Sequence, residues 1–192
     1  MREIVCLRSD RADRPVTGIG EHGQGDLRGF RWPVGVTHPI AAPPEQVWAT
    51  ISSPGNLDLC HPFCEKNPVL VWPGAGSRDE IHYLSGRVYE RRFCRWIEGV
   101  GYDLEIGAHG EETSFVSWRI EPVGQANCTL NITVYPHVIQ RVPIVFRWLP
   151  HVAYLRPMLR RYLSSVVQGF EWYLTSGKPV SRNQFGSHPW FS

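Results

Sequence analysis

Apolar and polar side chains alternate along the middle of the chain. In residues 100–106 four apolar side chains are separated by glycine, aspartate and glutamate, and the same period of two recurs in residues 116–120 and 128–134. This period predicts strands with one buried and one exposed face. Further strands are expected at residues 69–72, 80–89 and 90–98. Because the turn segments between them are short, we expect consecutive strands to pair antiparallel in one curved sheet.

The segment before these strands predicts a strand and two short helices. Val34, Val36 and Ile40 indicate the strand, and Ala42-Pro43-Pro44-Glu45 is typical of a helix start, because proline is tolerated in a first helical turn. Ser53-Pro54 repeats the start signal and predicts a second helix through Leu57 and Cys60.

A long amphipathic helix is predicted near the C-terminus, over residues 157–176. Pro157 suits its first turn, and Gly177 with Pro179 indicates its end. Its apolar side chains fall at helical spacing on one face, which we expect to cover the apolar face of the sheet. These side chains are Leu155, Met158, Leu159, Tyr162, Leu163, Val166, Val167, Phe170, Tyr173 and Leu174.

The two ends of the chain differ from this body. Residues 1–30 are rich in charge and glycine, have little to bury and predict a loosely structured arm. Residues 181–192 contain several aromatic side chains, so we expect this tail to dock on the folded domain at residues 31–180.

The order of these elements resembles the START-like, helix-grip superfamily (SRPBCC). The residues that carry the resemblance are Ile40–Trp48, Pro54-Gly55-Asn56-Leu57, His61-Pro62-Phe63 and Trp72-Pro73-Gly74. The resemblance covers roughly residues 32–180. Within the superfamily, the chain is similar to the polyketide cyclase/dehydrase and lipid-transport group. It implies an α+β fold, in which a curved antiparallel sheet of about six to seven strands grips the long C-terminal helix. It also implies a cavity between sheet and helix for a lipid, a polyketide or another apolar molecule.

We expect the walls of this cavity to come from the inward positions of the sheet and helix, and we expect no cofactor or metal. The candidate ligand-binding residues are Tyr102, Leu104, Val116, Trp118, Leu130, Ile132, Leu159, Tyr162, Val166 and Phe170.

A proline-rich apolar bridge joins the last predicted strand to the last helix. Residues 136–157 contain a proline at every seventh position, which predicts short helical pieces with kinks. Three interpretations stay open: extra core packing, a lid that binds the anionic head of a ligand, or a membrane-surface patch over residues 138–156. The candidate lid residues are Arg141, Phe146, Arg147, Trp148 and Arg156.

The formal charge of +2 is the sum of two unlike parts. Residues 1–121 contain 13 basic and 17 acidic side chains, net −4, whereas residues 122–192 contain 7 basic and 1 acidic, net +6. The overall balance argues against a nucleic-acid partner. The cationic apolar bridge instead favours an apolar or anionic amphipathic small molecule.

Two other clusters have competing interpretations. Cys60-His61-Pro62-Phe63-Cys64 is either half of a metal site, which would need further ligands, or a turn with buried thiols. Among Arg91, Arg92 and Arg95, either all pair at the surface, or one turns into the cavity, where it would require an anionic partner. The alternation of apolar side chains around residues 91–97 does not show which of these arginines would face the cavity and which would face solvent.

These observations favour a non-enzymatic binding or transport protein for an apolar or amphipathic small molecule. The first alternative is a polyketide aromatase/cyclase or dehydratase, which would need polar groups that converge inside the apolar pocket. A chaperone-activator-type interaction module is the second alternative and would need an exposed apolar patch. Since no secretory signal or long apolar run is evident, and the five cysteines form an odd set, we expect reduced thiols in a cytoplasmic protein.

Overall fold

The computed structural model describes residues 32–137 and 151–192. Their order is β1 (Val34–Ile40), α1 (Pro44–Ile51), α2 (Leu57–Cys60), β2 (Cys64–Lys66), β3 (Val69–Val71), β4 (Arg78–Tyr83), β5 (Val88–Ile97), β6 (Gly101–Gly107), β7 (Ser114–Pro122), β8 (Cys128–Tyr135), the π-helical turn η3 (His151–Leu155) and α4 (Arg156–Ser176). The candidate lid residues Arg141, Phe146, Arg147 and Trp148 lie outside the described residues, as does the arm at residues 1–30.

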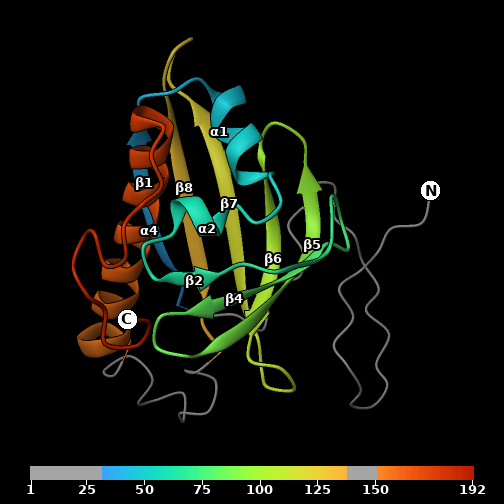
Figure 1. Ribbon diagram of the computed structural model, residues 1–192, viewed down its shortest axis with the longest axis vertical. Coiled ribbons are helices and arrows are strands. Elements are labelled where there is room, and N and C mark those ends of the chain that lie inside the picture. The colour runs from blue at the N-terminus through green and yellow to red at the C-terminus, as the bar shows by residue number, and fades with distance from the viewer. Residues whose placement is uncertain (1–31, 138–150) are drawn as a thin grey trace.

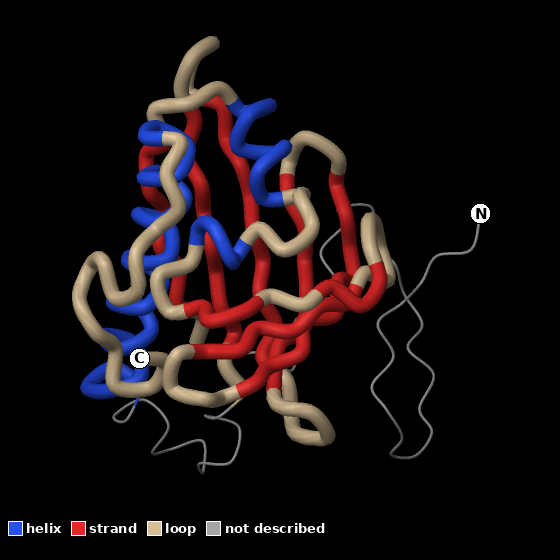
Figure 2. Tube along the Cα trace, in the orientation of Figure 1, coloured by secondary structure: helices blue, strands red, loops and turns tan. Residues whose placement is uncertain are grey.

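The strands form one antiparallel sheet in the order β1-β8-β7-β6-β5-β4-β2, with β3 also paired to β4. Figures 1 and 2 show α1, α2 and α4 on one side of this sheet, with β2 and β4 running across the direction of β6, β7 and β8. The architecture is the helix-grip fold that the sequence predicts.

The sheet has eight strands rather than six or seven, because β2 is only three residues long and too short to show a period, whereas β3 matches the strand expected at residues 69–72. One predicted boundary is also wrong. The chain turns back at residues 84–87, not at residues 89–90, so Tyr89 lies inside β5 and pairs with Ile81 of β4. A β-bulge between Phe93 and Arg95 explains why the alternation there was ambiguous, since it shifts the pairing register with β6.

Helix α4 covers the apolar face of the sheet. Leu163, Val167 and Phe170 are buried, and the Phe170 ring meets the Trp118 ring of β7 edge to face, with 5.3 Å between centroids. The helix ends at Gly177, whose left-handed backbone (φ 67°) allows its N–H to bond to the Tyr173 carbonyl.

A close contact between α4 and α2 depends on Gly169. A Cβ atom at this position would lie 2.1 Å from the carbonyl oxygen of Cys60, so only glycine allows the two backbones to approach this closely. The contact fixes the loop after α2, which includes His61, beside the middle of α4.

Residues 181–192 pack against the same region. The Asn183 N–H donates to the Pro62 carbonyl at 2.9 Å, and the Ser85 N–H donates to the Phe191 carbonyl at 3.3 Å. The Phe191 side chain is buried, with ring centroids 4.5 Å from both Tyr83 and Tyr162. The tail thus contributes a wall to the space between sheet and helix.

Candidate functional site

A cavity of about 440 Å³ lies between the sheet, α4, α2 and the tail. Most of its surface is apolar, and six of its wall positions come from β6, β7 and β8 in the alternation that the sequence shows. The sheet contributes the side chains Ile81, Tyr83, Tyr89, Arg91, Leu104, Ile106, Val116, Trp118, Ile132 and Val134, and the helices and tail contribute Leu57, His61, Leu155, Leu159, Tyr162, Leu163, Val166, Trp190 and Phe191.

Seven of the ten predicted wall residues line this cavity: Leu104, Val116, Trp118, Ile132, Leu159, Tyr162 and Val166. The other three, Tyr102, Leu130 and Phe170, are fully buried in the core and are not among the lining residues. Arg156 is exposed at the start of α4 and does not line the cavity. Whether any of these residues contacts a ligand stays a prediction.

One end of the cavity contains polar groups that converge from distant parts of the chain. His61 Nε2 lies 3.0 Å from the Tyr162 hydroxyl, which lies 3.0 Å from the Tyr83 hydroxyl. Burial raises the pKa of both phenols, so they stay protonated as hydrogen-bond donors. Burial, with a smaller effect of the Arg91 charge, lowers the pKa of His61 to about 3, so its imidazole is neutral.

Arg91 is the arginine of β5 that turns inward. It is 2% exposed, lines the cavity and is bound by Asp79, its direct cross-strand partner on β4. Arg91 Nε donates to Asp79 Oδ1 at 2.7 Å and Nη2 donates to Oδ2 at 2.5 Å. Burial alone would lower the pKa of the guanidinium, but the Asp79 carboxylate more than offsets this and raises it. The anionic partner that the sequence argument requires therefore comes from the protein itself.

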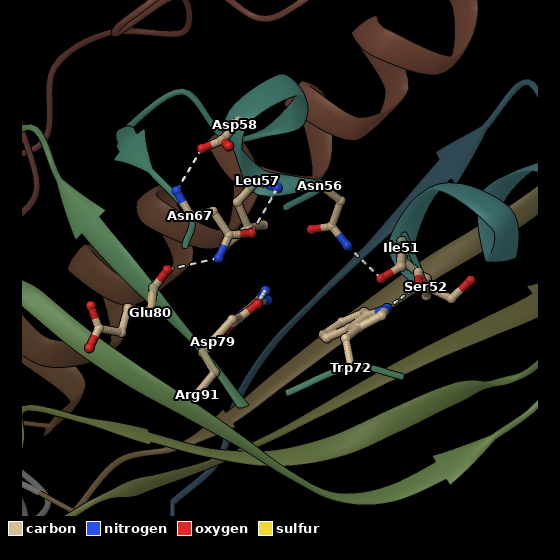
Figure 3. A network of polar contacts seen from close by, with 10 residues as sticks. All are labelled: Ile51, Ser52, Asn56, Leu57, Asp58, Asn67, Trp72, Asp79, Glu80 and Arg91. Carbon is tan, nitrogen blue, oxygen red and sulfur yellow. Dashed lines mark hydrogen bonds and ion pairs between the residues drawn. The ribbon is translucent and has the colours of Figure 1, made fainter. Parts of the chain in front are cut away.

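Asn67, after β2, holds α2 in place beside this ion pair (Figure 3). Its Oδ1 accepts a hydrogen bond from the Leu57 N–H, its Nδ2 donates to the Glu80 carbonyl, and its own N–H donates to Asp58 Oδ1. These bonds tie the start of α2 to β4, so His61 is positioned on a fixed element.

The Cys60–Cys64 cluster has the character of a turn with buried thiols. Burial raises the pKa of both thiols to about 12, so both are protonated. His61 Nδ1 accepts the Phe63 N–H, and its Nε2 faces Tyr162. Over residues 32–137 and 151–192, no three histidine, cysteine or acidic side chains are grouped to hold a metal ion.

Three of the described cysteines, Cys60, Cys64 and Cys128, are free thiols, as expected. Within the part of the chain that the structure describes, no helix is both long and apolar enough to cross a membrane.

The opposite end of the cavity opens between the β6–β7 loop, the end of β8 and η3. Its lining residues include Arg87, Glu111, Glu112, His137 and Tyr154. The described mouth therefore has one arginine against two glutamates and offers no excess of positive charge to an anionic ligand.

A curved antiparallel sheet that encloses an apolar cavity with one long helix defines a START-like, helix-grip protein. The chain belongs to the polyketide cyclase/dehydrase and lipid-transport family, whose model matches residues 31–171. A search of curated protein sequences finds no match.

Solved structures agree with this fold at low sequence identity. A START superfamily protein from Mycobacterium smegmatis matches with a TM-score of 0.61 at 14% identity, over 76% of this chain and 99% of that one. Norcoclaurine synthase from Thalictrum flavum matches with a TM-score of 0.56 at 16% identity, over 76% and 95%. The di-domain aromatase/cyclase BexL from the BE-7585A biosynthetic pathway matches with a TM-score of 0.59 at 12% identity, over 74% of this chain and 47% of that one.

Proposed function

We propose that the protein binds an apolar small molecule in the cavity between the sheet and α4. The observation that carries this proposal is the cavity itself, about 440 Å³ of largely apolar space with a mouth at one end. Protein interiors are normally packed without voids of this size, so an unfilled cavity forfeits stability that a ligand would restore.

The test is ligand binding with the mouth open and blocked. Ile106→Trp places a large ring at a half-buried lining position of β6 and should abolish binding of a neutral fluorescent probe such as N-phenyl-1-naphthylamine. Val100→Trp is the matched control, since Val100 is 41% exposed just before β6 and does not line the cavity. Equal probe binding by both variants would overturn the proposal, and native mass spectrometry of the purified protein should show a bound apolar molecule.

A cyclase or dehydratase activity is a second candidate, because polar groups do converge at the inner end of the cavity. In an intramolecular aldol condensation, a base takes a proton from a carbon beside one carbonyl, the new C–C bond forms at a second carbonyl, and that oxygen takes up a proton. The phenols of Tyr83 and Tyr162 could stabilise the oxygen that receives the proton.

The missing part is the base. Both His61 nitrogens are hydrogen-bonded, and both Asp79 oxygens are bound to Arg91. Among the described inner-end residues no base is therefore free to take the carbon-bound proton, which favours binding over catalysis. Formation of an aromatic product from a poly-β-ketone thioester, followed by mass spectrometry and absent in Tyr83→Phe/Tyr162→Phe, would reverse this preference.

A further inference from the structure

The inner end of the cavity contains a hydrogen-bonded row of three groups: His61, Tyr162 and Tyr83. The Nε2–Oη and Oη–Oη distances are both 3.0 Å. All three residues line the cavity, and they come from the loop after α2, from α4 and from β4. The direction of the hydrogen bonds in this row decides what it can offer to a ligand.

That direction is set by His61. Its Nδ1 accepts the Phe63 N–H at 3.2 Å and so carries no hydrogen. The imidazole is buried close to the Arg91 charge and is neutral, so its one hydrogen is on Nε2. His61 therefore donates to the Tyr162 oxygen.

A count of hydrogens then leaves one unused. The row contains three donor hydrogens, one on His61 Nε2 and one on each phenol, but only two contacts. One contact uses the histidine hydrogen, and the contact between the phenols uses one of theirs. Neither hydroxyl has another hydrogen-bond partner among the described residues, so the second phenol hydrogen is available on the cavity wall.

The surroundings of this spare hydrogen have no net charge. Asp79 binds Arg91 through both of its oxygens, and the side chains are 0% and 3% exposed, respectively. Among the described residues of the inner end a buried carboxylate would find no unpaired cation, so it would lose its hydration without compensation. A neutral acceptor, such as a ketone oxygen, loses much less on burial.

We infer that the inner end of the cavity selects a neutral ligand with an acceptor oxygen, such as a ketone, which receives the spare O–H of the Tyr83–Tyr162 pair. This inference rests on the proposed binding function and names the chemical class of the ligand's buried end.

Three rigid probes of one shape test it: 9-fluorenone, fluorene and fluorene-9-carboxylate. Affinities are measured by quenching of tryptophan fluorescence, and the carbonyl stretching band of bound fluorenone by infrared spectroscopy. Fluorenone should bind with its carbonyl band shifted to lower frequency, as a hydrogen bond requires. The carboxylate should bind at least about a hundredfold more weakly than fluorene, because its charge is not paired.

The tyrosine variants give a distinctive pattern. In Tyr83→Phe one hydroxyl and one contact are lost together, so one spare hydrogen remains on Tyr162. In Tyr162→Phe both contacts are lost, so the Tyr83 O–H and the His61 Nε2–H are both spare, and in either variant the carbonyl shift persists. Tyr83→Phe/Tyr162→Phe frees the His61 Nε2–H, so only the triple variant His61→Phe/Tyr83→Phe/Tyr162→Phe removes all three donor hydrogens of the row. The ratio of fluorenone to fluorene affinity should then fall about fivefold and the carbonyl shift should disappear. Circular dichroism and thermal unfolding show that each variant is folded.

The outcomes separate this inference from the proposed function. If fluorene and fluorenone bind but the folded triple variant keeps the affinity ratio and the carbonyl shift, or if the carboxylate binds as tightly as the ketone, the inference is wrong. If neither fluorene nor fluorenone binds to the folded wild-type protein, the binding function itself is wrong, and the inference with it.

Discussion

The Asp79–Arg91 pair offers the sharpest test of how the cavity wall is stabilised. Asp79→Asn keeps the shape of the side chain but removes its charge, which leaves the Arg91 guanidinium buried without an anion. Asp79 is fully buried and Arg91 is 2% exposed, so solvent cannot replace the lost partner. Breaking a buried pair of this kind costs about 3–5 kcal/mol, a large share of the roughly 5–15 kcal/mol that a domain has in total.

Urea unfolding, followed by tryptophan fluorescence, measures this loss. With a slope of about 2 kcal/mol per molar urea, the midpoint should fall by about 2 M. Glu65→Gln is the matched control, since it breaks the exposed Arg182–Glu65 contact, which is also 2.7 Å long, and should cost less than about 1 kcal/mol.

A double substitution isolates the cause of the loss. Asp79→Leu/Arg91→Met removes both charges and should be more stable than Asp79→Asn, because no unpaired charge remains. The reasoning is refuted if Asp79→Asn destabilises no more than Glu65→Gln, or if the double substitution costs more than the single one.

Three further predictions concern the elements around the cavity. His61 takes up a proton near pH 6.5 in the unfolded chain but only near pH 3 in the folded protein, so its contribution to stability is complete above pH 6.5 and is lost as the pH falls. In urea unfolding, His61→Gln should remove about 2 kcal/mol of the stability that the wild-type protein loses between pH 7 and pH 5. An unchanged pH dependence would contradict the burial of a neutral imidazole. Gly169→Ala should destabilise the protein by about 1–3 kcal/mol, since the clash with the Cys60 carbonyl outweighs the gain of about 1 kcal/mol in helix propensity. The control Gln168→Ala, at a half-buried position, should change the urea midpoint little. Equal midpoints for the two variants would show that α4 shifts without cost. Phe191→Ala should lower the stability measured by thermal unfolding by up to about 3 kcal/mol and should weaken fluorene binding. Phe191→Leu should have effects between those of the wild type and Phe191→Ala. If Phe191→Ala changes neither stability nor fluorene binding, the tail is not a cavity wall.

The long periodic elements could be predicted from the sequence because each has one buried face. Leu104, Val116 and Ile132 sit at inward positions of β6, β7 and β8, and the alternation there shows which residues face the helix. The pattern does not separate a cavity wall from a solid core, since both are apolar. Tyr102 has the same alternation as Leu104, yet it is enclosed by the rings of Phe93 and Trp118 and does not reach the cavity.

The boundary between β4 and β5 shows a second limit. Apolar side chains lie on both sides of the turn, so their period suggested strands, but the turn is at Ser85-Gly86, where Gly86 has a φ of 82°, and not at residues 89–90. The register places Asp79 opposite Arg91, which is a relation between two strands and not a property of either segment. For this reason the inward arginine could be suggested from β5, but its partner could not.

The polar inner end is the part of the site that no local pattern could reveal. His61 follows a four-residue helix, Tyr83 ends a six-residue strand, and Tyr162 occupies an ordinary apolar position of a long helix. They meet because Gly169 allows α4 to contact α2, and because Asn67 ties α2 to β4. The chemistry of the cavity therefore depends on two residues outside its lining, so a change at Gly169 or Asn67 should alter ligand selection even where the fold survives.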